Sequence, residues 1–531
     1  MASAETIEDR LNALPEAFNV ATEFVDRNIR EGRADKVAIE SGEERVTYRQ
    51  LLERTNRAGN MLRQLGVRSE ERVLLLLLDS PEFLYAFFGA IKIGAVPVPA
   101  NTLLKPREYE HLLNDSRARV VVVAEELLPA LQSIPRERLK HLREIIVAGG
   151  SRQDFPGLGD AMEASSAELE AELTSKDAPA FWLYSSGSTG APKACVHLQH
   201  DMVVCSEMYA KRVLGMDSND RCYSVARLFF AYGLGNAGYF PLYCGATTIL
   251  SPARPTPANV CATVERCRPT LFFSVPTNYA ALLAHRREDG RECDFSSVRL
   301  AVSAGESLPA SLFERFRQQF GVEILDGLGS TETLQMVISN RPGEAKPGSS
   351  GKPVPGYEAR IVDDEGRVVA PGEIGNLLIK GDSLCAGYWN QHERTKDAFQ
   401  GHWFRMGDKY FQDEEGYFHY AGRADDIFKV NGRWLSPIEV ESALIAHPAV
   451  REAAVVAHSD ENGLIKPAAC VVAQPGISTD QELARKLQDW VAESIGGYKS
   501  PRWIIFLPEL PKTATGKLQR FKLRNLEKLS A

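Results

Sequence analysis

The chain is 531 residues long, with 44% hydrophobic residues, 25% charged residues and a formal net charge of −8. This length exceeds what a single hydrophobic core supports, so two or more domains are expected. The mild negative charge disfavours nucleic acid or an anionic membrane as the main partner. The longest aliphatic run, Val73 to Leu78, is too short to span a membrane, and Met1 to Arg10 lacks the pattern of a signal peptide.

Strand-like and helix-like segments alternate through the first 150 residues. A region that is helical at both ends, 20–65, precedes a buried strand at 73–78 and a helix at 81–93. Further β-branched runs follow at 120–123 and 145–147, separated by helical stretches. This alternation predicts an α/β fold with a mostly parallel sheet.

A loop rich in glycine and hydroxyl groups follows the apolar run Phe181 to Leu183. Tyr184 to Lys193 contains two glycines, several hydroxyls and one lysine. Glycines allow successive backbone N–H groups to converge on an anion, and the lysine supplies charge for phosphate oxygens. The spacing is not that of a Walker A loop, and such a loop is by itself more often a solvated linker.

The second half repeats the alternation and then changes character. Strands at Leu271 to Pro276 and Leu300 to Glu306 run into polar or glycine turns, where ligands sit in open α/β sheets. From about residue 341, dense Pro and Gly with strand-like pieces predict a small β subdomain. We place the domain boundary between residues 422 and 423, which gives an N-terminal domain over 1–422 and a compact α+β domain over 423–531.

Nine cysteines are scattered along the chain without a Cys-x-x-Cys pair. An odd number at irregular spacings is typical of reduced thiols rather than of a disulfide framework or a zinc site. We therefore expect buried thiols and a cytoplasmic protein.

Four more clusters carry chemistry: Asp326 to Thr333, Trp403 to Asp408, Gly422 to Gly432 and Pro511 to Arg520. Taken singly, each has an ordinary explanation as a turn, an exposed group of ion pairs or a surface lysine. Together with the loop at 184–193, in this order and with these separations, they resemble the acyl-adenylate-forming superfamily. The resemblance covers about residues 20–525.

A nearer resemblance is to the benzoate-CoA ligase group, on Phe229 to Asn236 and Ser339 to Gly343. Relatives that act on fatty or acetyl acids commonly have a histidine where Phe230 stands, so the aromatic residue favours an aryl acid. The resemblance implies a large N-terminal domain of α/β/α layers with a small β subdomain, plus a small mobile α+β C-terminal domain. It also implies ATP-dependent formation of an aryl-AMP with release of pyrophosphate, followed by transfer of the acyl group to coenzyme A.

The resemblance assigns roles to single residues. Glu332 is expected to ligate Mg²⁺, Thr331 to contact the α-phosphate and Lys517 to bridge the attacking carboxylate and the phosphoryl oxygens. Asp425 is the expected hinge of the C-terminal domain, and Lys429 and Gly432 are expected to line the coenzyme A tunnel. The nucleotide site is predicted to contain Ser185, Ser186, Gly187, Ser188, Thr189, Gly190, Lys193, Gly305, Glu306, Asp326, Gly327, Leu328, Thr331, Asp408, Arg423 and Lys517.

A group of uncharged residues is predicted to form the aryl-acid pocket: Phe230, Ala231, Tyr232, Ser303, Ala304, Gly305, Gly329, Gln335 and Met336. Small residues beside Tyr232 suit a flat ring in a slot. Many benzoate ligases carry a histidine where this chain has Gln335, which offers both a donor and an acceptor. One hypothesis is that Gln335 binds an ortho substituent, which would make 2-aminobenzoate (anthranilate) as plausible as benzoate. The alternative is that Gln335 is a neutral replacement at the pocket rim.

Other functions also fit parts of the pattern. A stand-alone aryl adenylation enzyme would load a carrier protein in trans, because the chain contains no carrier module. A luciferase-type oxidation is less favoured. A silent nucleotide-binding scaffold is disfavoured by the joint presence of Glu332, Asp408 and Lys517. The pattern is compatible with a monomer or a homodimer.

Overall fold

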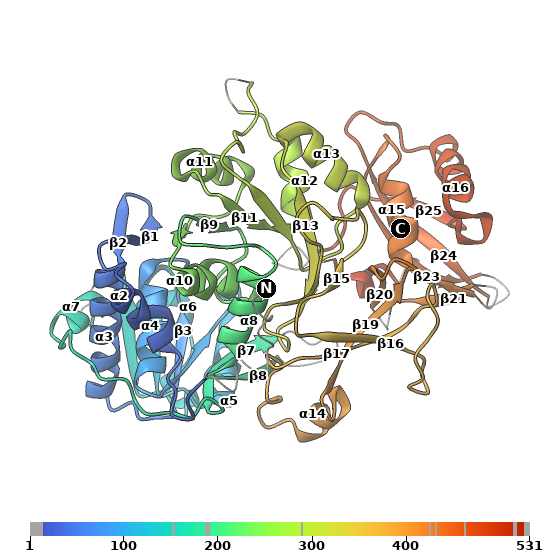
Figure 1. Cartoon of the computed structure of the whole chain (residues 1–531). Helices are drawn as coiled ribbons and strands as arrows, with labels where there is room; N and C mark the ends of the chain where they lie inside the picture. The colour runs from blue at the N-terminus through green and yellow to red at the C-terminus, as the bar shows by residue number, and fades with distance from the viewer. Residues whose placement is uncertain are drawn as a thin grey trace, which may run out of the picture.

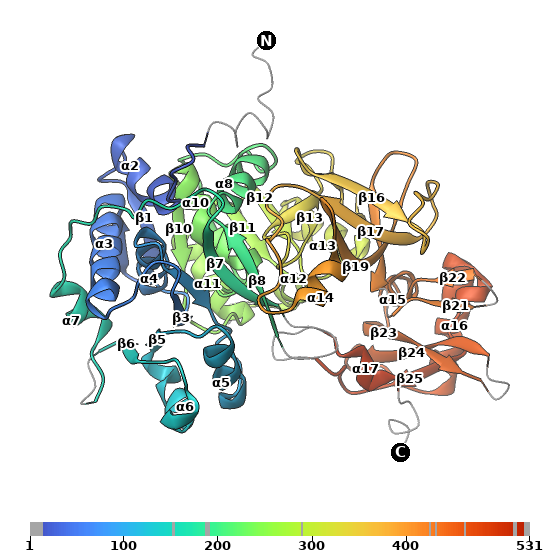
Figure 2. The same cartoon turned by 90° about the horizontal axis from the view of Figure 1, so that it is seen from below.

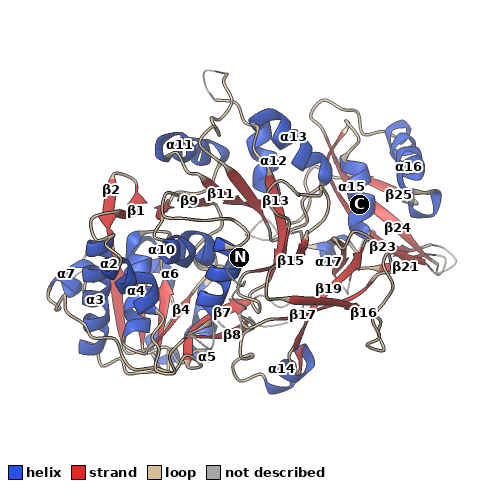
Figure 3. Ribbon diagram, viewed as in Figure 1, coloured by secondary structure: helices blue, strands red, loops and turns tan. Residues whose placement is uncertain are grey.

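The computed structural model describes residues 14–150, 154–185, 192–287, 290–423, 426–430, 433–460, 464–512 and 518–524. A large α/β body formed by the residues up to Arg423 lies beside a smaller C-terminal lobe (Figures 1 and 2). Figure 3 shows helices covering the sheets of the large body. The described residues contain no helix that is both long and apolar enough to cross a membrane.

The central sheet has nine strands in the order β15-β14-β13-β12-β11-β9-β10-β1-β2. The strands from β1 to β13 along this order are parallel, whereas β2, β14 and β15 pair antiparallel. The bounds are β1 Val37–Ser41, β2 Glu44–Thr47, β9 Arg221–Ser224, β10 Thr247–Leu250, β11 Leu271–Ser274, β12 Leu300–Ser303, β13 Ile324–Gly329, β14 Met336–Ser339 and β15 Lys352–Pro353.

Alternate residues of these strands enter two different cores, because successive side chains of a strand point to opposite faces. On β11, Phe272 packs into a cluster with helices α11 (Pro257–Cys267), α12 (Pro276–Ala284) and α13 (Ala310–Phe320), while Leu271 and Phe273 enter the largest core. The sheet is therefore buried on both faces, which explains its continuous apolar runs.

A second, fully parallel sheet has the order β4-β3-β5-β6, with β3 Arg72–Leu76, β4 Val96–Pro99, β5 Val120–Ala124 and β6 Glu144–Ala148. Its neighbouring helices are α2 Arg27–Arg30, α3 Tyr48–Gln64, α4 Pro81–Lys92, α5 Pro106–Asp115, α6 Leu128–Gln132 and α7 Leu158–Glu163. Thr47 caps α3 through a capping box with Gln50. Helices α3 and α4 approach closely at two glycines: a Cβ added to Gly89 would lie 2.8 Å from the backbone N of Gly59.

Between the two sheets lies the antiparallel hairpin β7 (Pro179–Ser185) and β8 (Lys193–Leu198), which pairs Ser185 with Lys193. It is followed by α8 Asp201–Cys205, α9 Ala231–Gly233 and α10 Phe240–Cys244, with π-helical segments at Ser206–Lys211 and Leu234–Tyr239. A third π-helical segment, Thr22–Asp26, precedes α2.

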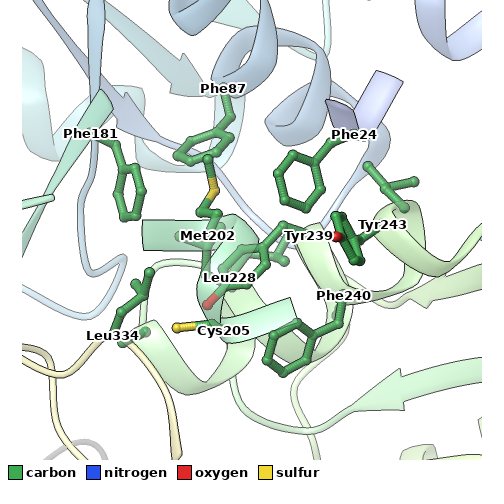
Figure 4. Close-up of a cluster of buried hydrophobic side chains, with 14 of the residues drawn as sticks. Phe24, Phe87, Phe181, Met202, Cys205, Leu228, Tyr239, Phe240, Tyr243 and Leu334 are labelled. Atoms are coloured by element: carbon green, nitrogen blue, oxygen red, sulfur yellow. The ribbon is translucent and has the colours of Figure 1, made fainter. Parts of the chain in front are cut away.

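The largest core joins these parts. Figure 4 shows Phe87 of α4, Phe181 of β7 and Tyr239 of a π-helical segment converging in one apolar cluster. Leu334, from the turn between β13 and β14, enters the same cluster beside Cys205. The turn is thereby fixed to the interior of the large body.

An antiparallel sheet follows, with β16 Glu358–Val362, β17 Gly375–Lys380, β18 Phe399–Gln400, β19 Trp403–Gln412 and β20 Phe418–Arg423, and with helix α14 His392–Ala398 beside it. This sheet confirms the predicted β subdomain. The C-terminal lobe contains β21 Phe428–Val430, β22 Arg433–Leu435, α15 Pro437–Ile445, β23 Val450–Ser459, β24 Ile465–Ala473, α16 Gln481–Ile495, β25 Trp503–Phe506 and α17 Arg520–Leu523. Its core of Val440, Leu444, Val455, Val471 and Leu487 gives the predicted α+β character.

Three expectations from the sequence need correction. Cys261 and Cys293 form a disulfide with Cα atoms 5.4 Å apart, so not every cysteine is a free thiol; the other seven are free and buried. The glycines at 327 and 329 belong to strand β13 rather than to a turn, which begins only after Gly329. Strand β1 was not predicted, because its apolar run, Val37 to Ile39, is short and its partner strand β10 is distant in sequence.

Candidate active site

Lys193 and Glu332 form an ion pair at the centre of the candidate site. Lys193 opens β8, and its Nζ lies 2.9 Å from Oε1 of Glu332. The Tyr388 hydroxyl lies 2.8 Å from this Nζ and donates to the same carboxylate oxygen at 2.9 Å. Ser185, at the end of β7, donates to Glu332 over 3.5 Å. Four side chains from three separate parts of the chain thus meet where the hairpin loop begins and ends.

The charge of Glu332 is set by two opposing effects. Glu332 is only 7% exposed, and burial alone would raise its pKa. The Lys193 ammonium and the Tyr388 hydroxyl outweigh burial, so the pKa of Glu332 lies below its ordinary value. Glu332 is therefore ionised at neutral pH.

The turn that carries Thr331 and Glu332 has an ordered hydrogen-bond pattern. Ser330 N donates to Thr333 Oγ1 at 2.8 Å, and Thr333 N donates to Ser330 Oγ at 3.3 Å. Leu334 has a φ of +66°, a left-handed conformation that costs free energy in a bulky residue. Burial of the Leu334 side chain offsets this strain and presents Thr331 and Glu332 toward Lys193.

An ionised Glu332 fits a Mg²⁺ ion that arrives with nucleotide phosphates. Mg²⁺ is commonly held by one or two carboxylates together with substrate phosphates and water. The described residues contain no group of three or more His, Cys, Asp or Glu side chains arranged to hold a metal. A single carboxylate beside a lysine suits a metal that nucleotide phosphates help to bind.

Asp408 and Arg423 face each other across paired strands. Asp408 on β19 is opposite Arg423 on β20, and Arg423 Nη1 donates to Asp408 Oδ1 at 3.0 Å. The charge of Asp408 is the main cause that raises the pKa of Arg423, and Glu332 adds to it. Asp408 is nearly buried, so its carboxylate has a fixed direction.

The predicted adenine-side residues lie at the ends of two neighbouring strands. Ser303 pairs with Asp326, and the backbone N of Leu308 donates to the Asp326 carboxyl at 3.4 Å. Burial raises the pKa of Asp326 well above its ordinary value. Gly305 has a φ of +87°, which accounts for glycine at this position. The structure thus brings the 305–308 segment together with Asp326.

Most residues of the predicted aryl pocket also come together. The Tyr232 hydroxyl donates to the carbonyl oxygens of Val302 at 3.0 Å and Ser274 at 3.2 Å. Gly329 pairs with Met336, and a Cβ at 329 would lie 2.5 Å from the Gln335 carbonyl oxygen. Phe230 is 37% exposed and packs against Phe229, with ring centroids 4.5 Å apart. Ala231, Ser303, Ala304 and Met336 are buried.

Gln335 makes its hydrogen bonds within the protein. Its Nε2 donates to the Tyr232 carbonyl oxygen at 3.1 Å and to Asn236 Oδ1 at 3.3 Å, and its Oε1 accepts from Met336 N at 3.0 Å. The side chain is only 3% exposed. Both amide hydrogens are engaged, so this geometry gives no support to Gln335 as a donor to a ring substituent.

Several predicted residues lie outside the described part of the chain: Ser186, Gly187, Ser188, Thr189, Gly190, Asp425, Gly432 and Lys517. The backbone of Lys429 lies in β21, and its side chain is also outside the description. Sequence reasoning missed Tyr388 and Asn236. Tyr388 lies 195 residues after Lys193, and no local pattern marks it. Asn236 ends the run Phe229 to Asn236, and its polar amide in this apolar run could have marked it as a candidate site residue.

Comparisons with known proteins agree with this geometry. Residues 25–389 match the sequence profile described as AMP-binding enzyme, and residues 439–517 match that of the AMP-binding enzyme C-terminal domain. A benzoate–CoA ligase of Thauera aromatica is 47% identical over 514 residues, covering 96% of this chain and 97% of that protein.

Two solved structures are similar over nearly their whole length. An anthranilate CoA ligase in complex with anthranoyl-AMP has a TM-score of 0.93 and 45% identity, covering 98% of this chain and 99% of the other. A benzoate CoA ligase from Burkholderia xenovorans LB400 has a TM-score of 0.87 and 42% identity, covering 96% and 100%.

Proposed function

This chain belongs to the AMP-binding enzyme family, and from that premise we propose that it is an ATP-dependent, AMP-forming aryl-CoA ligase. It joins the carboxylate of a benzoate-type acid to the AMP part of ATP with release of pyrophosphate, and then transfers the acyl group from the aryl-AMP to the thiol of coenzyme A with release of AMP. The observation that carries the proposal is the meeting of Lys193 and an ionised Glu332 at 2.9 Å beside the hairpin loop.

Each of the charged residues binds a different part of the nucleotide. Lys193 and the loop from Ser185 to Gly190 hold the β- and γ-phosphates, and Thr331 contacts the α-phosphate. Glu332 would hold Mg²⁺, which when bound would neutralise charge on the phosphates. Asp408 accepts hydrogen bonds from the ribose hydroxyls, with Arg423 holding its carboxylate in place. Adenine lies against 305–306 and 326–328.

Two half-reactions share this site. In the first, Lys517 bridges the attacking carboxylate and the phosphoryl oxygens, where negative charge accumulates in the transition state. In the second, rotation of the C-terminal domain at Asp425 removes Lys517 and brings Lys429 and Gly432 to the coenzyme A tunnel.

The acid is an aromatic carboxylate, with benzoate and anthranilate as the two leading candidates. A slot between Tyr232, Gly329 and Met336 suits a flat ring. Both amide hydrogens of Gln335 are engaged within the protein, which leaves only its Oε1 to take part in any choice between the two acids.

Pyrophosphate release over a panel of acids tests this proposal. Benzoate, anthranilate, salicylate and 4-hydroxybenzoate are compared with acetate and octanoate under the same conditions. We expect an aryl acid to be at least tenfold better than the aliphatic acids, since one well-filled apolar site gives discrimination of roughly this size. Equal rates with aliphatic acids would contradict an aryl pocket.

The second candidate is an aryl adenylation enzyme that loads a carrier protein. The two functions share the first half-reaction and differ in the acceptor thiol. Rates of acyl transfer from the aryl-AMP to free coenzyme A and to a phosphopantetheine carrier separate them. We expect coenzyme A to be the faster acceptor. A cytoplasmic location and the oligomeric state stay predictions.

A further inference from the structure

His197 is a completely buried histidine with an acceptor at each ring nitrogen. Its Nε2 lies 2.8 Å from the carbonyl oxygen of Thr331, and its Nδ1 lies 2.8 Å from Oδ2 of Asp201. Neither His197 nor Asp201 is exposed at all. The ring also stacks on Phe181, with centroids 5.2 Å apart and planes at 18°. Its position is therefore fixed on every side.

The hydrogen on Nε2 follows from its partner. A carbonyl oxygen only accepts, so Nε2 must donate to Thr331. The Asp201 carboxyl at Nδ1 holds the ring in the orientation that lets Nε2 donate. Asp201 Oδ2 also accepts from Leu198 N at 3.1 Å, and its Oδ1 lies 3.3 Å from Nε2 of His200. These contacts fix the direction of the Nε2–H group.

One face of β8 contacts both residues of the active-site turn. Lys193 and His197 are four residues apart on this strand, so their side chains point the same way. Lys193 pairs with the side chain of Glu332, and His197 binds the backbone carbonyl of Thr331. The strand therefore fixes both the charge and the backbone direction of the turn.

Three successive carbonyl groups of this turn are held from outside it. The Glu332 carbonyl accepts from Cys385 N at 2.8 Å, and the Thr333 carbonyl accepts from Ser383 Oγ at 2.8 Å. The Thr331 carbonyl is held by His197, with a longer bond of 3.3 Å from Leu334 N within the turn. His197 is therefore the donor from outside the turn to the Thr331 carbonyl, and Thr331 is the residue proposed to contact the α-phosphate.

We propose that the Asp201–His197 pair positions the Thr331–Glu332 peptide for the first half-reaction. The inference rests on the proposed function, because Thr331 and Glu332 matter only if the chain activates an acid with ATP. His197 touches no substrate and acts through the Thr331 carbonyl. Loss of its donor allows the turn to shift, and a displacement of about 1 Å in a phosphoryl-transfer site costs on the order of a hundredfold in rate.

Two substitutions separate positioning from packing. In His197→Gln the amide nitrogen occupies the place of Nε2 and keeps a donor for Thr331. In His197→Asn the amide nitrogen occupies the place of Nδ1 and keeps only the contact with Asp201. Both variants are uncharged and remove part of the ring, so they share any general cost of altering the core.

The measurements are the kcat and KM of aryl-AMP formation, the rate of thioester formation from supplied aryl-AMP, and the thermal midpoint. We expect His197→Asn to lower kcat for aryl-AMP formation about tenfold to a hundredfold, with thioester formation changed less than about threefold. We expect His197→Gln to retain most of the wild-type kcat. Equal losses in the two variants, no loss in either, or equal loss of both half-reactions would overturn the proposal.

If His197→Asn does not fold, His197→Gln decides alone. A kcat for aryl-AMP formation above a tenth of the wild-type value supports the proposal, and a lower value contradicts it. Failure of the proposed function itself has a different signature, because the wild-type protein would then form no aryl-AMP from any acid in the panel.

Discussion

Single buried polar residues determine what this site can do. Glu332 stays ionised because Lys193 and Tyr388 compensate for its burial. The side-chain amide nitrogen of Gln335 donates both of its hydrogen bonds within the protein, to Tyr232 and Asn236. The first arrangement favours a bound cation, and the second makes Gln335 part of the pocket wall. Both conclusions depend on partners that are distant in sequence.

Tyr388→Phe tests whether the Tyr388 hydroxyl helps to keep the buried Glu332 carboxyl ionised. The phenol oxygen donates to Glu332 at 2.9 Å, and losing this bond removes one interaction that lowers the carboxyl pKa. A carboxylate with a lowered pKa loses its charge as the pH falls through that pKa, so the variant should lose activity at a higher pH. We expect the acidic limb of the pH profile of aryl-AMP formation to move upward by roughly half to one pH unit. An unchanged limb would contradict the assignment.

Asp79→Asn tests the buried carboxyl of Asp79, which contacts the backbone of Leu228. Asp79 accepts from Leu228 N at 3.1 Å, and burial raises its pKa to about 6 despite Arg227. The folded protein then binds a proton that the unfolded chain releases near pH 4, so this group's stabilisation is lost as pH rises from 4 to 6.

The stability of the wild type minus that of Asp79→Asn should therefore fall by about 2–3 kcal/mol between pH 4 and pH 7. Denaturant unfolding of both proteins at the two pH values measures this difference. A difference that is constant, or that grows with pH, would show that Asp79 is not held protonated in the folded protein.

At the scale of elements, the sequence predicted correctly those strands that are apolar along their whole length. The runs at 120–123 and 271–274 lie within β5 and β11, because a buried strand is marked by its own apolar residues. Strand β1 and the Cys261–Cys293 pair escaped prediction, because each depends on a partner brought close only by the fold. The Lys193–Tyr388 contact escaped for the same reason.

Gly235→Ala tests the close packing of the π-helical segment Leu234–Tyr239 on Gln335. A Cβ at 235 would lie 2.2 Å from Gln335 Nε2 and 3.0 Å from two further side-chain carbons, so the buried amide must move. We expect the KM for the acid to rise about tenfold, equivalent to about 1.4 kcal/mol, as Tyr232 loses its partner.

Gly238→Ala is the matched control in the same segment. Its nearest neighbour is Leu234 Cδ1 at 3.3 Å, and the next lies at 3.7 Å. We expect acid KM values near that of the wild type. Similar KM values for both alanine variants would show that the Gly235–Gln335 approach does not shape the pocket.

At the scale of the whole molecule, the fold class was predictable and the domain arrangement was not. The large α/β body, the small β sheet and the α+β lobe appear as predicted. The boundary between 422 and 423 and the hinge at Asp425 stay predictions. Asp425 and Lys517 lie outside the described residues.

Lys517→Ala tests the division of labour between the lobes. Removing a positioned ammonium from the first transition state should lower the rate of aryl-AMP formation by about 10²–10³-fold or more. Thioester formation from supplied aryl-AMP should persist, because the proposed rotation removes Lys517 from the site before that step. Equal loss of both steps in single-turnover assays would assign Lys517 a different role.

The most direct test of the account is the product balance with benzoate or anthranilate, ATP, Mg²⁺ and coenzyme A. We expect AMP, pyrophosphate and the aryl-CoA thioester in equal amounts, with aryl-AMP accumulating when coenzyme A is omitted. Formation of ADP and phosphate, or the absence of thioester from every aromatic acid, would contradict it.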